Sequence, residues 1–158
     1  MLDNNLLSLK YHVLLLLAFI VVANVIPYTI VLFICIFGVL IAYFYIGMVL
    51  SPQKNIVLNF LSVSSIAIIG VILWLICYLI YTLSSDPLSD VPFAFLIYYS
   101  NSMGIKFLLD YFHLVDDISF DNSFLQVSFM SVFIPSILIW LGMSCKLLIS
   151  KIGNYEES

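Results

Sequence analysis

Residues 84–123 read SSDPLSDVPFAFLIYYSNSMGIKFLLDYFHLVDDISFDNS, and this stretch decides how the rest of the chain is organised. It holds six of the seven aspartates of a chain that otherwise consists of long apolar runs. Its first part, Ser84–Pro92, combines serine, aspartate and proline in a way that is typical of a loop. We therefore expect one large polar connection between apolar segments on either side.

The second part of this stretch, residues 93–115, predicts an amphipathic helix. Lys106, Asp110, His113 and Asp117 recur at helical spacing and share one face, opposite an apolar face. On the insertion scale, a charged side chain at the bilayer centre costs about 2.5 to 3.5 kcal/mol. We therefore expect this helix to lie on the membrane surface, to cap the bundle or to be re-entrant, rather than to cross the membrane.

The apolar runs on both sides indicate an integral membrane protein. Of the 158 residues, 64 % are hydrophobic and 9 % are charged, whereas soluble proteins average about 25 % charged residues. The run from Tyr11 to Gln53 contains no charged residue and is about twice as long as a membrane span. A water-soluble fold is excluded by this composition.

The sequence predicts an all-α bundle of four transmembrane helices in one membrane domain, residues 1–158. Pro27 divides the long run, because proline removes a hydrogen-bond donor and disfavours helix in the residue before it. Lys10 and His12 at the start of the short first span can extend to the membrane interface. The predicted spans cover about residues 9–25, 28–50, 56–83 and 124–144, with the outer loop at 84–123.

The charges predict the orientation of these spans. In a four-span arrangement the lysines at 10, 54, 146 and 151 lie on one side, and the six aspartates of the outer loop lie on the other. The positive-inside rule places the lysine side in the cytoplasm. We therefore expect a multi-pass protein of the bacterial inner (plasma) membrane with both termini cytoplasmic.

Two small-residue patterns predict helix packing. Asn59, Ser62 and Ser65 share a face of the third predicted span and are followed by Gly70. On the second span, Gly38 and Ala42 form a small-xxx-small pair. Small and hydrogen-bonding residues of this kind mediate contacts between membrane helices.

An outer-face acidic cluster is the one candidate metal site. Carboxylates with one imidazole suit calcium, magnesium or manganese. The spacing lacks the glycine and final glutamate of a calcium loop and lacks the HExxH pattern of zinc sites, so a solvated polar face is the alternative and we expect no cofactor. The cluster consists of Asp110, His113, Asp116, Asp117 and Asp121.

The composition also limits the function. A net charge of −4 with five lysines and no arginine argues against nucleic-acid binding, and no glycine-rich nucleotide loop is present. We expect a non-catalytic protein whose partners are the lipid bilayer and another membrane protein or complex. It would act by protein–protein contact within the membrane or at its outer face, as an accessory subunit or as an immunity protein against a pore-forming toxin or bacteriocin.

Two other function classes stay open on the sequence. One is a small transporter or channel component. The other is a membrane enzyme that uses the outer-face aspartates, either as an aspartyl-peptidase-like pair or with a metal ion.

Overall fold

The structure, a computed structural model, describes residues 1–25, 29–83 and 129–156, and within these ranges every regular element is a helix and none is a strand. The all-α class predicted from the sequence is confirmed for these residues. Residues 129–131 are helical and lead through a turn at 132–133 into the last helix. In chain order the helices are α1 (Leu2–Val25), α2 (Thr29–Val49), α3 (Ile56–Leu61), α4 (Ser65–Leu83) and α8 (Ile134–Glu156).

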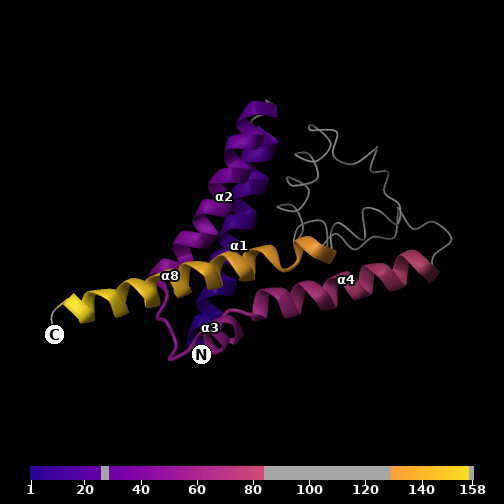
Figure 1. The fold of residues 1–158 in the computed structure, drawn as a ribbon. Coiled ribbons are helices and arrows are strands. Elements are labelled where there is room, and N and C mark those ends of the chain that lie inside the picture. Colours follow the sequence, from indigo (N-terminus) through magenta and orange to yellow (C-terminus); the bar gives the residue numbers. More distant parts are fainter. Residues whose placement is uncertain (26–28, 84–128, 157–158) are drawn as a thin grey trace.

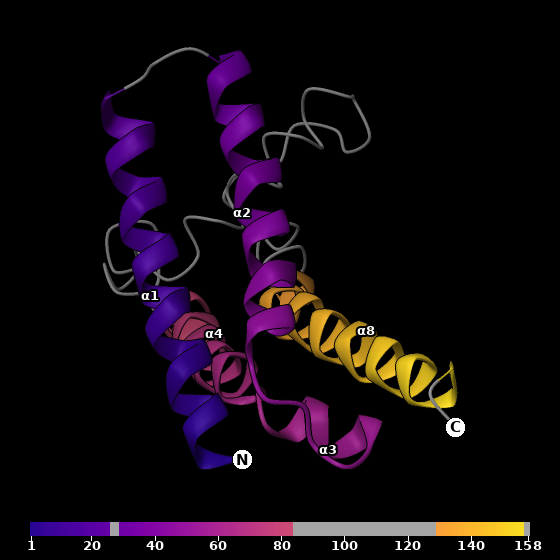
Figure 2. The same cartoon turned by 90° about the vertical axis from the view of Figure 1, so that its left-hand side faces the viewer.

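The long helices form two pairs that are set across each other. Helices α1 and α2 lie side by side and antiparallel, while α4 and α8 run across this pair near the end where α1 begins (Figures 1 and 2). The short helix α3 lies at the same end, close to the N-terminus of the chain (Figure 2). Both pairs therefore meet at one end of the α1–α2 hairpin.

The core of the described residues lies where α2 crosses α8. Tyr43 and Ile46 of α2, with Leu50 directly after it, are buried against Ile139 and Met143 of α8, and Val63 and Ile66 close the same cluster. Gly47 and Gly142 allow this close crossing: a Cβ on Gly142 would come within 3.0 Å of the Cα of Gly47. Without side chains at these two positions, the helix backbones approach each other directly, as small residues permit in membrane helices.

Among the residues that the structure describes, two helices are long and apolar enough to cross a membrane, by length and composition. They cover Leu2–Val22 and Phe129–Ser150, and shorter apolar helices cover Ile34–Val49 and Ser65–Ile80. The first helix begins at Leu2, earlier than the predicted start at residue 9. The number of spans and their orientation stay predictions.

The third predicted span, residues 56–83, is not one continuous helix. It consists of α3 and α4, with a turn at residues 62–64 between them. Asn55 caps the start of α3, because its side-chain oxygen accepts a hydrogen bond of 2.8 Å from the backbone N–H of Leu58. At the break after Leu61, polar side chains from α1 and α8 bind the backbone groups that it frees.

Candidate functional site: a polar junction of helix ends

Polar side chains from four helices and the turn between α3 and α4 meet where α1 begins, α3 ends and α4 begins. Asn4, Ser8, Asn59, Ser62 and Ser136 are buried, and Asn5 and Ser65 are half-buried. Buried polar groups are costly unless they are hydrogen-bonded, so their contacts decide what this region does. We call the set Asn4, Asn5, Ser8, Asn59, Ser62, Ser65 and Ser136 the polar junction.

Asn5 inserts its side-chain amide into a helix hydrogen bond. In a continuous helix over residues 56–83, the N–H of Ser65 would donate to the carbonyl of Leu61, four residues earlier. In the structure, Asn5 Nδ2 donates to the Leu61 carbonyl at 3.0 Å, and the Ser65 N–H donates to Asn5 Oδ1 at 3.0 Å. A side chain inserted into the backbone ladder is a recognised cause of a helix kink.

Ser65 makes a second hydrogen bond to Asn5, through its hydroxyl group. The Ser65 hydroxyl donates to the backbone carbonyl of Asn5 at 3.0 Å, and the Ser8 hydroxyl donates to that carbonyl as well. Residues from α1 thus satisfy backbone groups that the break in the third span would otherwise leave without partners.

Asn4 and Asn59 fix the turn between α2 and α3. Asn4 Nδ2 donates to the Ser51 carbonyl at 2.8 Å and to the Ser62 hydroxyl at 3.4 Å. Asn59 Oδ1 accepts from the backbone N–H of Gln53, and the Asn59 carbonyl accepts from the Ser62 hydroxyl at 2.8 Å. The turn at residues 51–55 is therefore connected to both α1 and α3 by side-chain hydrogen bonds.

Helix α8 also contacts the break, through Ser136 and through the Met143 sulfur, which lies 4.0 Å from the Ser62 hydroxyl. The Ser136 hydroxyl donates to the Val63 carbonyl at 3.1 Å, and both residues are fully buried. Among the described residues, the buried atoms Asn59 Nδ2 of the junction and Ser144 Oγ of α8 have no hydrogen-bond partner. The junction therefore pairs most of its polar atoms, chiefly with backbone groups.

A second polar contact joins α1 to α2. His12 and Tyr43 are almost fully buried, and His12 Nδ1 lies 2.7 Å from the Tyr43 hydroxyl in a hydrogen bond. The sequence predicted that His12 extends to the membrane interface, but its ring is directed inward. Lys10, two residues earlier, is exposed.

Two of the described lysines, Lys54 and Lys146, lie where α2 ends. Lys146 Nζ donates to the carbonyls of Val49 and Leu50, at 3.3 Å and 3.0 Å, where α2 ends. A cation at a helix C-terminus is favourable, because the unsatisfied carbonyls there carry partial negative charge. Lys54 lies exposed in the turn that follows.

Of the residues predicted to mediate helix packing, some are buried or contact another helix in the structure and one is exposed. Asn59 lies on α3, Ser62 in the turn and Ser65 at the start of α4; Ser62 and Ser65 both contact α1. Gly70 is buried and Ala42 half-buried, whereas Gly38 is exposed, and a Cβ added there would meet no described atom within 4 Å.

The predicted acidic cluster lies outside the described residues. The same holds for the whole outer loop 84–123, including the predicted helix at 93–115, and for residues 124–128 of the fourth predicted span. Within the described ranges, no group of three or more His, Cys, Asp or Glu side chains is arranged to hold a metal ion.

Sequence reasoning missed the residues of α1 that complete the junction. In the sequence, Asn4 and Asn5 indicate only a polar lead before the first span. The available signal was that two adjacent asparagines begin an apolar helix, where amide groups need hydrogen-bond partners. Their partners are mostly backbone groups, which no side-chain pattern reveals.

Comparison with known proteins finds no relative. No protein-family model matches the chain, and neither a curated protein nor a solved structure matches it. Function is therefore inferred from the chemistry of the junction and of the outer helix surfaces.

Proposed function

We propose that this chain is an integral membrane protein that acts by contact with another membrane protein and not by catalysis. The observation that carries the proposal is where the described helices place their polar and apolar side chains. Hydroxyl and amide side chains are buried at the junction, whereas large apolar side chains lie exposed along α1, α2 and α4. Extended exposed apolar surface of this kind marks a membrane or protein contact surface.

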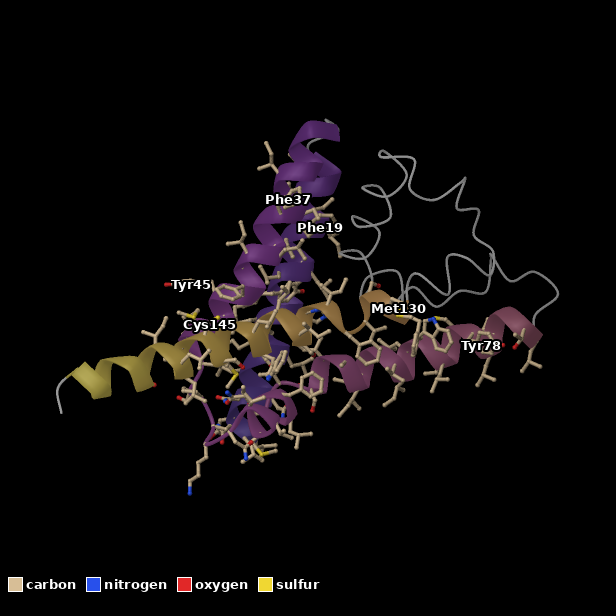
Figure 3. The ribbon with its side chains drawn as sticks, viewed as in Figure 1. Phe19, Phe37, Tyr45, Tyr78, Met130 and Cys145 are labelled. Carbon is tan, nitrogen blue, oxygen red and sulfur yellow. The ribbon has the colours of Figure 1, made fainter. Side chains whose placement is uncertain are left out.

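The outer side of α4 shows the exposed apolar side chains most clearly. Ile68, Ile72, Leu75, Leu79 and Leu83 recur at helical spacing and are each about half exposed or more. Tyr78 projects from the same helix, and on α2 Tyr45 projects away from the α1–α2 pair (Figure 3). In water such a surface would be unfavourable, since each fully buried side chain of this size gains about 1.5 to 3 kcal/mol.

The proposed arrangement in the membrane has four spans, with both termini in the cytoplasm. Lys54 and Lys146 support this orientation, because both lie where α2 ends, and α1 begins nearby through the contact of Asn4 with Ser51. Positive charge concentrated at one end of a helix pair favours the cytoplasmic side.

A contact role is supported by what the polar groups of the described residues do. The junction uses its amides and hydroxyls mainly to bind backbone carbonyl and N–H groups of its own helices. Its chemistry is thus that of a structural joint, and the outer helix faces are the surfaces that another membrane helix would meet. We propose two roles of this kind: an accessory subunit of a membrane complex, or an immunity protein.

Photo-cross-linking from the outer face of α4 tests the proposal. A photoreactive amino acid is placed at Ile72 or Leu79, with the buried Ile139 as the control position, and native membranes are irradiated. We expect one discrete protein adduct from the exposed positions and none from Ile139. Adducts with lipid alone at both exposed positions would contradict the contact role.

A further inference from the structure

The break between α3 and α4 separates two segments whose sequence is compatible with one continuous helix. Residues 56–83 contain no proline and no charged residue. In the structure the ladder is interrupted at residues 62–64, and side chains from other helices take its place. The local sequence therefore permits a straight helix, and the bend depends on tertiary contacts.

Two side chains from other helices supply these contacts, in addition to the Ser64 hydroxyl within the break, which donates to the Leu61 carbonyl at 3.0 Å. Asn5 of α1 bridges the Leu61 carbonyl and the Ser65 N–H, the pair that would bond directly in a straight helix. Ser136 of α8 donates to the Val63 carbonyl, which in a straight helix would accept from the N–H of Ala67. Both contacts substitute for the missing turn of helix.

No covalent bond holds the side chains of Asn5 and Ser136 in place of the helix hydrogen bonds, so their replacement of those bonds is reversible. If Asn5 and Ser136 withdraw, the Ser65 N–H and the Val63 carbonyl lose their partners, and Val63 is fully buried, so its carbonyl cannot turn to water. In the ladder of a continuous helix their partners are the Leu61 carbonyl and the Ala67 N–H. Removal of the two side chains therefore favours straightening over a disordered break.

We infer that the α3–α4 break is a two-position hinge that Asn5 and Ser136 hold in its bent position. In the second position, residues 56–83 form one straight helix, and the exposed apolar face of α4 points in a new direction. A partner that displaces the first turns of α1 would thereby redirect α4. The hinge itself rests on hydrogen bonds inside the chain, and only its use by a partner rests on the proposed contact role.

A distance measurement between spin labels tests the hinge. Cysteines replace Val57 on α3 and Leu79 on α4, which are 65 % and 54 % exposed, after the native Cys35, Cys77 and Cys145 have been changed to serine. In a straight helix the two labelled positions lie about 33 Å apart at 1.5 Å per residue, and a bend makes the separation shorter.

The double variant Asn5→Ala, Ser136→Ala is expected to lengthen this separation to about 33 Å, with helical circular dichroism retained. A matched control, Asn55→Ala with Ser150→Ala, removes an asparagine and a serine whose hydrogen bonds are local to α3 and α8. Its separation should stay that of the parent protein. Lengthening in the control as well would overturn the inference.

Ser65→Pro supplies the second variant. Proline has no N–H to donate to Leu61, is accepted at the first position of a helix, and disfavours helix at Ser64. Added to the double variant, it should restore the short separation. Three results would each overturn the hinge: an unchanged separation in the double variant, loss of its helical signal, or a long separation that persists after Ser65→Pro is added.

Discussion

Gly47 of α2 and Gly142 of α8 face each other with no side chain between the two helix backbones. A Cβ on Gly47 would collide with the carbonyl oxygen of Ile139, and one on Gly142 with that of Phe44. The clash is with backbone atoms, so a rotamer change cannot relieve it. The two glycines therefore set the closest approach of α2 and α8, around which the buried core is packed.

Alanine at either of these glycines should separate the two helices. We expect Gly47→Ala and Gly142→Ala each to lower stability by about 1 to 3 kcal/mol, the usual cost of inserting volume into a packed site. Thermal unfolding in mild detergent, followed by circular dichroism, measures the effect. Gly38→Ala is the control and should be neutral or slightly stabilising, because the new methyl group meets no described atom. Equal losses at all three positions would disprove the close crossing.

The hydrogen bond between His12 and Tyr43 should contribute measurably to the pairing of α1 with α2. Tyr43→Phe removes the hydroxyl and leaves the ring in the core, so we expect a loss of about 1 kcal/mol, within the range for a buried group deprived of a partner. A double-mutant cycle with His12→Leu isolates the pairwise contribution. Strict additivity of the two single losses would show that the bond carries no energy.

Lys146 should stabilise the end of α2 through its charge. Lys146→Met keeps most of the apolar stem but removes the ammonium group that donates to Val49 and Leu50. We expect a loss of about 1 kcal/mol, the upper part of the usual range for a cation at a helix end. Lys146→Arg retains a donor and should lose less. If methionine and arginine behave alike, the interaction is not electrostatic.

The sequence predicted the class of the fold better than its internal arrangement. Apolar runs bounded by Pro27 and by the turn at 51–55 predicted the helices that became α1 and α2, because span length and proline act locally. The pattern could not predict that residues 56–83 bend at residue 62. At that bend the Ser65 N–H donates to Asn5, which lies more than fifty residues earlier in the chain.

The candidate site was only partly predictable for a related physical reason. Asn59, Ser62 and Ser65 stood out as polar residues in an apolar segment. Their partners include the carbonyls and N–H groups of Gln53 and Asn5, which are present at every residue and leave no mark in the sequence. Gly47 and Gly142 were missed because neither has another glycine or an alanine four residues away, as the small-xxx-small pair Gly38 and Ala42 has.

Cysteine accessibility in intact cells tests the central claim most directly, that the chain crosses the membrane with its lysine-bearing end in the cytoplasm. In a background without native cysteines, Lys54→Cys reports on the turn at 51–55 and Asp117→Cys on the loop that the sequence places outside. An impermeant maleimide should label Asp117→Cys in intact cells and Lys54→Cys only after permeabilisation. Labelling of Lys54→Cys in intact cells would contradict the account.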